Sequence, residues 1–97
     1  MRCVEFLVLR APPERAAAAA ALLAEGVRYT DQPAELLGHW ILRHRTISGD
    51  IALMFLWQGE VDPEGSSLGR ELRTFLAEYG ITNHAMWTAE EAKMGAP

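Results

Sequence analysis

The chain has 97 residues, a formal net charge of −4 and a hydrophobic share of 49%. This length supports one domain over residues 1–97, and this hydrophobic share excludes a disordered chain. The acidic balance, with 9 Lys and Arg against 13 Asp and Glu, argues against a nucleic-acid-binding protein, which needs a basic face to neutralise phosphates.

The sequence also indicates where the protein works. A single cysteine, Cys3, cannot form an internal disulfide, so we expect a reducing compartment. No apolar run reaches the length of about 18 residues that a membrane-spanning helix needs. Glu5 interrupts the apolar run near the N-terminus, which is unlike a signal peptide. We therefore expect a cytoplasmic protein with no membrane partner.

Hydrophobic periodicity and turn signals predict six elements. Pro13 suits the first residue of a helix, and six consecutive alanines follow it, with Gly26 as the expected C-terminal cap. The segment 27–37 is irregular, and 34–37 can form one helical turn before the second strand. A capping-box pattern from Thr88 indicates a short terminal helix. The predicted order is strand, helix, strand, strand, helix, strand, over residues 2–10, 14–25, 38–46, 51–58, 67–79 and 81–87.

The second and third strands form a hairpin whose turn we place at Ser48-Gly49, a pair that two-residue turns favour. This turn sets Trp40 opposite Trp57, and opposed residues lie on the same face of a sheet. The face expected in the core carries Trp40, Leu42, His44, Leu53, Phe55 and Trp57. The face expected at a cleft or a partner carries His39, Ile41, Arg43, Arg45, Ala52, Met54, Leu56 and Gln58.

This order of elements is the ferredoxin-like α+β plan, a four-stranded antiparallel sheet with two helices on one face. The first and third strands are nearly continuous apolar runs, as central strands should be. The second and fourth strands carry polar residues, as edges should.

Two helices cover only one face of such a sheet, so the other face needs a partner. The residues expected on that face are apolar, and they include Leu7, Leu9, Ile41, Met54 and Leu56. A soluble monomer rarely exposes so large an apolar surface. We therefore expect a homodimer in which two sheets pack face to face.

The chain resembles the dimeric α+β barrel superfamily, and its antibiotic-biosynthesis monooxygenase branch in particular. The similar stretches are Pro33 with 37–43, then 51–57 closed by Trp57, and finally 79–87 with His84. The chain departs from the branch at Ala34, where a glycine is usual, and in its long loop at 59–65. The resemblance implies the barrel fold, a homodimer and, in some members, cofactor-free oxygenase or isomerase activity.

Strand alternation gives a candidate site. Val4, Phe6 and Val8 suit the helix side of the first strand, so Glu5 should face the cleft. Ile81, Ala85 and Trp87 suit the core, which turns alternate residues of the last strand to the cleft. The expected catalytic residues are Glu5, Arg43 and His84, and the expected ligand-binding residues are His39, Met54 and Met86.

Each of these residues also has a structural interpretation. Glu5 and Arg43 can form an ion pair that only stabilises the fold. His84 can be a surface residue of an edge strand, and His39 a residue at the rim. The two methionines can be core filler, the three tryptophans core residues, and Cys3 an inert thiol.

Metal and cofactor chemistry receives no support from the motifs. His39 and His44 point to opposite faces of a regular strand, and no HxH or HxxxH pair occurs. P-loop, GxGxxG, GxSxG and CxxC patterns do not occur. We expect a protein without a metal site or a cofactor.

Two functions remain open. The first is a cofactor-free monooxygenase or isomerase acting on an aromatic or polyketide-like small molecule. A base, Glu5 or His84, would remove a proton, and Arg43 would stabilise the anion across an apolar cavity. The second is a non-catalytic ligand-binding or assembly domain, such as an ACT-like regulatory domain. An enzyme needs at least two of Glu5, Arg43 and His84 inside one cavity, whereas side chains fill an interface.

Overall fold

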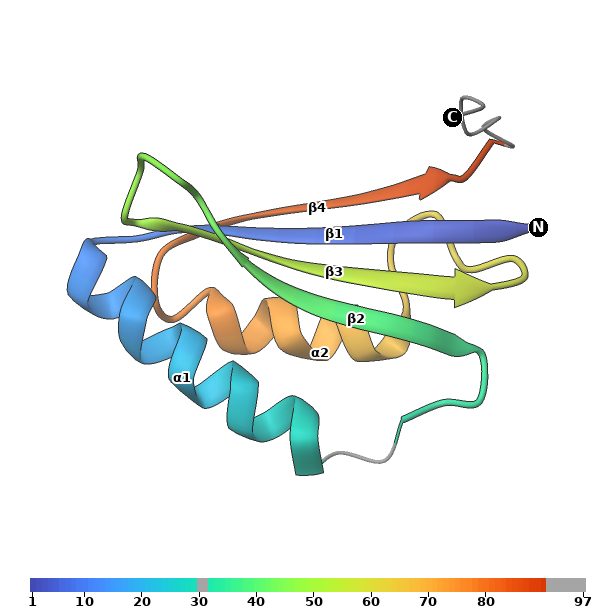
Figure 1. The fold of residues 1–97 in the computed structure, drawn as a ribbon, viewed down its shortest axis with the longest axis horizontal. Helices are drawn as coiled ribbons and strands as arrows, with labels where there is room; N and C mark the ends of the chain where they lie inside the picture. The colour runs from blue at the N-terminus through green and yellow to red at the C-terminus, as the bar shows by residue number, and fades with distance from the viewer. Residues whose placement is uncertain (30–31, 91–97) are drawn as a thin grey trace, which may run out of the picture.

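The structure, a computed structural model, describes residues 1–29 and 32–90, and within these it contains four strands and two helices (Figure 1). The elements are β1 Arg2–Arg10, α1 Pro13–Tyr29, β2 Leu36–Arg43, β3 Asp50–Gln58, α2 Ser67–Leu76 and β4 Ile81–Thr88. Helix α1 runs through Gly26 to Tyr29, so the predicted glycine cap does not end it. The predicted terminal helix has its first residue in β4, and its residues 91–97 lie outside the described part.

The four strands form one antiparallel sheet in the order β2-β3-β1-β4. This confirms the ferredoxin-like α+β plan, with the first and third strands central. Helix α1 contacts β2 and β3, and α2 contacts β1 and β4. Figure 1 shows both helices on the same side of the sheet, and no described element covers the other side. We call that other side the open face.

The core lies between the sheet and the helices. Burial alternates along both central strands, so every second side chain is buried against the helices. The buried strand residues are Cys3, Glu5, Leu7, Leu9, Ile51, Leu53, Phe55 and Trp57. The helices contribute Ala16, Ala19, Leu23 and Leu76. Glu5 is therefore a carboxylate inside an otherwise apolar layer.

The predicted faces of three strands are wrong. In β1 the odd-numbered residues, including Glu5, are buried, and Val4, Phe6 and Val8 lie on the open face. In β4, His84 lies opposite Leu7 on the helix side, and Trp87 is 61% exposed. In β2, Trp40 and Leu42 lie on the open face and Ile41 lies on the helix side, which is again the reverse of the prediction. The prediction is correct for β3 alone, and Leu7, Leu9 and Ile41 are not open-face residues.

The register of the hairpin explains the inversion of β2. The turn forms at Ser48-Gly49, because the Asp50 amide donates to the Ile47 carbonyl at 3.1 Å. His44, however, lies opposite Asp50 rather than Leu53, because its amide donates to the Asp50 carbonyl at 3.1 Å. The register is displaced by three residues. Because three is an odd number, the displacement exchanges the two faces of the strand. Trp40 therefore lies opposite Met54 and not Trp57.

The His44 side chain holds the longer loop in place. Its Nδ1 accepts hydrogen bonds from the amides of Thr46 at 3.1 Å and Ile47 at 3.0 Å. These bonds satisfy backbone donors that would otherwise pair in the β2–β3 ladder. The His44 side chain thus stabilises the five-residue connection 45–49. The composition of the turn alone does not predict this contact.

The open face is largely apolar, with Asn83 and the Arg10–Asp50 pair as polar exceptions. Ala52, Met54 and Leu56 lie on it as predicted, and its other apolar residues differ from the predicted ones. The face carries Val4, Phe6, Val8, Trp40, Leu42, Ala52, Met54, Leu56, Ala85 and Trp87. Trp40 is 43% exposed and Trp87 61% exposed. The corrected register thus leaves two tryptophans on the face without helices.

Candidate functional site

The centre of the candidate site is the Glu5 carboxylate, which is fully buried on β1. Its Oε1 accepts the indole Nε1–H of Trp57 at 2.9 Å and the hydroxyl of Ser66 at 2.7 Å. Its Oε2 accepts the Ser66 amide at 2.9 Å and lies 2.6 Å from Nε2 of His84. A buried carboxylate requires such donors, because burying it unpaired would be very costly. One side chain thus links β1, β3, β4 and the start of α2.

His84 is the second titratable member of the site. Its side chain is only 5% exposed, and its Nε2 faces the carboxylate. No described residue forms a hydrogen bond with its buried Nδ1. The carboxylate at Nε2 orients the imidazole, as in catalytic pairs that combine these two groups. Buried polar atoms without partners are rare and merit a functional explanation.

Two glycines allow the backbone to approach this pair. Ser66 is the N-cap of α2, and its hydroxyl accepts from the Gly69 amide at 2.9 Å. A Cβ on Gly69 would overlap the Glu5 carboxylate, so only glycine allows α2 to start here. Gly65 has a φ of +119°, and a Cβ there would overlap the His84 ring. The carboxylate at the N-terminus of α2 also lies where the helix dipole favours negative charge.

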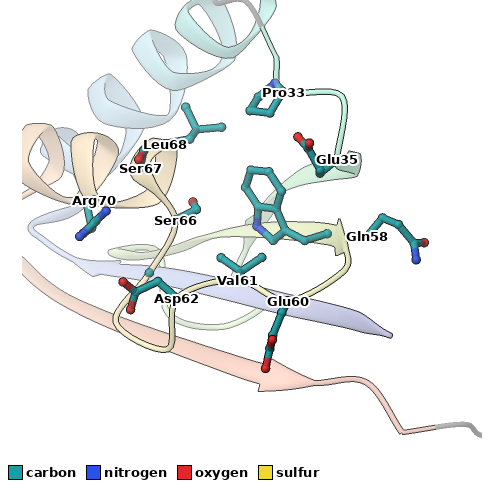
Figure 2. A pocket seen from close by; sticks show the side chains of 12 residues that line it. Pro33, Glu35, Gln58, Glu60, Val61, Asp62, Ser66, Ser67, Leu68 and Arg70 are labelled. Atoms are coloured by element: carbon teal, nitrogen blue, oxygen red, sulfur yellow. The ribbon is translucent and has the colours of Figure 1, made fainter.

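A cavity of about 440 Å³ adjoins this cluster at the end of β3. The start of α2 forms one side of it, Pro33 and Glu35 form another, and the loop after β3 forms a third (Figure 2). Its lining combines the Trp57 indole and aliphatic side chains with charged groups at the rim. The lining residues are Pro33, Glu35, Trp57, Gln58, Glu60, Val61, Asp62, Gly65, Ser66, Ser67, Leu68 and Arg70.

Two residues belong to both the cavity and the buried cluster. Trp57 lines the cavity and donates its Nε1–H to Glu5. Ser66 lines the cavity and donates its hydroxyl to the same carboxylate oxygen. The carboxylate and the imidazole themselves are not in the lining. The buried pair is thus one side chain away from the cavity.

The structure brings together two of the three predicted catalytic residues. Glu5 and His84 are in direct contact, on the helix side of the sheet rather than on the open face. Arg43 is not with them. It lies opposite Ile51 whereas Glu5 lies opposite Phe55, and β3 separates the two strands. Four residues along a strand correspond to about 13 Å, so Arg43 and Glu5 form no pair.

The predicted ligand-binding residues are dispersed. Met86 lies opposite Glu5 and is partly buried against the core. His39 lies on the edge strand opposite Phe55, and Met54 lies on the open face opposite Trp40. None of the three lines the cavity beside Trp57. A single lining formed by all six predicted residues is therefore wrong, because Met54 lies on the opposite face from the other five and Arg43 lies four residues along the sheet from the row of Glu5.

An arginine–carboxylate pair does occur on the sheet, at a different position. Arg10 donates to both oxygens of Asp50, at 3.1 and 3.2 Å, from opposed positions of β1 and β3. The hydrogen bond and the negative charge of Asp50 raise the pKa of Arg10 above its ordinary value. Arg43 lies nearby and lines a separate hollow of about 240 Å³ with Leu42 and Ala52. The arginines of the β2–β3 end thus have no contact with the Glu5 cluster.

Two residues of the site were not predicted from the sequence: Trp57 was not placed beside a cavity, and Ser66 was not named at all. A signal for Ser66 exists. A carboxylate within a buried apolar strand needs donors, and Ser66 begins the pattern Ser-x-x-Gly at the start of α2, which offers a hydroxyl and free amides. To recognise Ser66 as the partner of Glu5, one must know that α2 is the helix that packs on β1.

No protein-family model matches the chain, and no curated protein matches it. Solved structures match it over nearly its whole length. One is Rv0793 from Mycobacterium tuberculosis, with a TM-score of 0.72 and 12% identity over 97% of this chain and 100% of that one. Another is a Deinococcus radiodurans protein provisionally named an antibiotic biosynthesis monooxygenase, with a TM-score of 0.63 and 15% identity over 98% and 99% of the two chains.

A third is SnoaB, a cofactor-independent oxygenase from Streptomyces nogalater, with a TM-score of 0.56 and 18% identity over 94% of this chain and 93% of that one. At these identities the likeness shows a shared fold. The chain therefore has the fold of antibiotic-biosynthesis-monooxygenase-like proteins, as its sequence resemblance implied. Among the described residues, no helix is both long and apolar enough to cross a membrane.

Proposed function

We propose that the chain is a cofactor-free enzyme, an oxygenase or isomerase, that removes a proton from an aromatic or polyketide-like small molecule bound beside Trp57. The observation that carries the proposal is the position of Trp57, which lines the cavity and also donates to Glu5. A ligand stacked on the indole is then one side chain from the Glu5–His84 pair. The fold shared with a cofactor-independent oxygenase supports the same proposal.

The cavity suits a neutral ligand with an acidic hydrogen. Its volume of about 440 Å³ falls in the range of small-molecule sites. The lining carries three carboxylates, those of Glu35, Glu60 and Asp62, and one guanidinium, that of Arg70. This balance disfavours an anion on entry. Once the proton has left, Arg70 is the cation in the lining that can stabilise the new negative charge, the role that the sequence assigned to Arg43.

The Glu5–His84 pair supplies the base. It lies in a water-poor interior, where a fixed acceptor acts strongly on a developing charge. In the oxygenase reaction, a methylene carbon loses its proton, which reaches Glu5 through a side chain that borders the cavity, and the carbanion transfers electrons to O₂. The balance is R₂CH₂ + O₂ → R₂C=O + H₂O. In the isomerase reaction, the same proton returns to a different carbon and no oxidant is consumed.

The test is O₂ uptake and product formation with a panel of anthrones, hydroquinones and enolic ketones. We expect turnover by the wild type and a loss of at least tenfold in Glu5→Gln and His84→Gln. The glutamine at position 84 retains an N–H for Glu5 but has no imidazole ring. Arg43→Ala is the control and should keep wild-type turnover. Equal turnover in all four proteins would refute the proposal.

A second function has its own supporting observation. Both Glu5 oxygens are fully hydrogen-bonded, and neither Glu5 nor His84 lines the cavity. The condition stated for an enzyme, with two of Glu5, Arg43 and His84 inside one cavity, is therefore not met, and the proposed enzyme depends on a side chain that connects the pair to the cavity. A satisfied buried network is also what a structural pin requires. If no member of the panel binds, the chain is better described as an assembly or ligand-binding domain of the ACT-like kind.

We propose in addition that the protein is a homodimer joined through the open face. The exposed tryptophans Trp40 and Trp87 and the aliphatic residues between them support it, because a water-facing apolar layer of this extent is unfavourable. The same surface needs no other partner, and the acidic net charge does not favour nucleic acid. A cytoplasmic location, with the buried Cys3 reduced, fits this proposal.

A further inference from the structure

The proposed function needs a group that connects the cavity to Glu5, and Ser66 lies where such a group is required. It is 8% exposed, it lines the cavity, and its hydroxyl lies 2.7 Å from Oε1 of Glu5. Glu5 has no surface in the cavity, so a proton from a bound ligand needs a carrier. Trp57, the other residue that links the two, has a donor N–H and no acceptor, so it cannot carry a proton inward.

The hydrogen bonds of the hydroxyl leave one site free. A serine hydroxyl has one donor hydrogen and two acceptor lone pairs. The hydrogen goes to Glu5, which is an acceptor. One lone pair accepts the Gly69 amide at 2.9 Å. Among the described residues, no third contact of this oxygen occurs, and the residue borders the cavity.

We infer that the Ser66 hydroxyl carries a proton from an acidic O–H ligand in the cavity to Glu5. This inference rests on the proposed function. In the step, the ligand O–H bond breaks and its proton binds Oγ of Ser66, while the hydrogen of Ser66 moves to Oε1 of Glu5. One proton is transferred and no electron moves. The ligand becomes an anion beside Arg70, and Glu5 becomes a neutral acid that still accepts from Trp57.

The same geometry gives the site a preference for ligands. A phenol or enol can donate to the free lone pair of Ser66, whereas an isosteric methyl compound cannot. One neutral hydrogen bond corresponds to a difference of about twofold to tenfold in affinity. The ligand class is therefore an aromatic phenol or enol that enters in its neutral form.

The experiment compares 4-nitrophenol with 4-nitrotoluene, in which a methyl group replaces the hydroxyl, at a pH where free 4-nitrophenol is mainly neutral. In the wild type we expect bound 4-nitrophenol to show the phenolate absorption band. In Ser66→Ala the band should be lost, and the affinity ratio of phenol to toluene should fall about fivefold. Ser66→Thr keeps the hydroxyl and the helix cap, so it should restore both. Ser48→Ala, in the distant hairpin turn, is the control.

The outcomes separate this inference from the proposed function. If Ser66→Ala binds both ligands and keeps the band and the ratio of the wild type, the Ser66 inference is wrong and the cavity remains a binding site. If the wild type binds neither ligand, both proposals are wrong. Loss of an N-cap can lower stability by about 1 kcal/mol, so melting temperatures are measured in parallel. Neither the band nor the ratio changes through stability alone.

Discussion

The indole Nε1–H of Trp57 donates to Oε1 of Glu5 at 2.9 Å, between two central strands whose residues are 52 positions apart in the chain. This bond joins a group that borders a cavity to a carboxylate with no exposed surface. In the proposed function, this bond connects the Glu5–His84 pair to a ligand that the pair does not touch.

The first prediction concerns the stability of the cluster. Glu5→Gln places an NH₂ group against donors on Trp57 and Ser66, so at least one buried donor loses its acceptor. We expect a loss of about 2 kcal/mol in the free energy of unfolding, measured by urea denaturation. Glu71→Gln, an exposed substitution on α2, should change it by less than about 0.5 kcal/mol. A Glu5→Gln protein as stable as the wild type would mean that the carboxylate does not hold the elements together.

The second prediction concerns the two arginines. Arg70 lines the cavity beside Trp57, whereas Arg43 lies at the far end of β2. Arg70→Ala should weaken binding of a nitrophenolate anion by about threefold to tenfold, since it removes one exposed charge from the rim. Arg43→Ala should leave this affinity unchanged. Isothermal titration of both variants decides the matter, and a selective effect of Arg43 would move the site to the end of β2 where Arg43 lies opposite Ile51.

The third prediction tests the corrected register. Trp57 is 4% exposed, whereas Trp40 is 43% and Trp87 is 61% exposed. In proteins with a single tryptophan, iodide should quench Trp57 weakly at any protein concentration. Quenching of Trp40 and Trp87 should decrease as concentration rises, because a homodimer would cover the open face. Equal shielding of Trp40 and Trp57 in the dilute protein would support the register in which they lie opposite one another.

The fourth prediction concerns assembly. Sedimentation equilibrium at micromolar concentration should show a species of twice the chain mass. Met54→Asp or Leu56→Asp should shift it to the monomer, because each places an unpaired charge in the dimer contact. Ala17→Asp, on the exposed surface of α1, is the matched control and should remain dimeric. A single 10.8 kDa species for the wild type would show that the open face has no second copy on it.

The sequence was sufficient to predict the fold, because the order of elements and the polarity of the strands both depend on local pattern. The long apolar runs of β1 and β3 correctly identified them as the central strands. The hairpin turn was also located correctly at Ser48-Gly49. These features need no knowledge of distant contacts.

Local pattern could not predict which set of alternating side chains in each strand is buried against the helices. In β1 both sets of alternating residues are apolar except for Glu5, and polarity favoured the wrong set. The buried set contains Glu5 because its carboxylate is satisfied by Ser66 and His84, which lie 61 and 79 positions away. When only the sequence pattern is considered, a charged residue is assigned to the exposed face of its strand. Here long-range hydrogen bonds allow the Glu5 carboxylate to be buried. The loop held by His44 produced the matching error in β2.

The most direct test of the central claim is a ¹H–¹⁵N correlation spectrum of the wild type titrated with 4-nitrophenol. Each tryptophan contributes one indole N–H signal, and that of Trp57 reports the bond to Glu5 beside the cavity. We predict that the Trp57 signal shifts in a saturable manner, while those of Trp40 and Trp87 stay in place. Shifts confined to Trp40 and Trp87 would contradict the account and place the ligand on the open face.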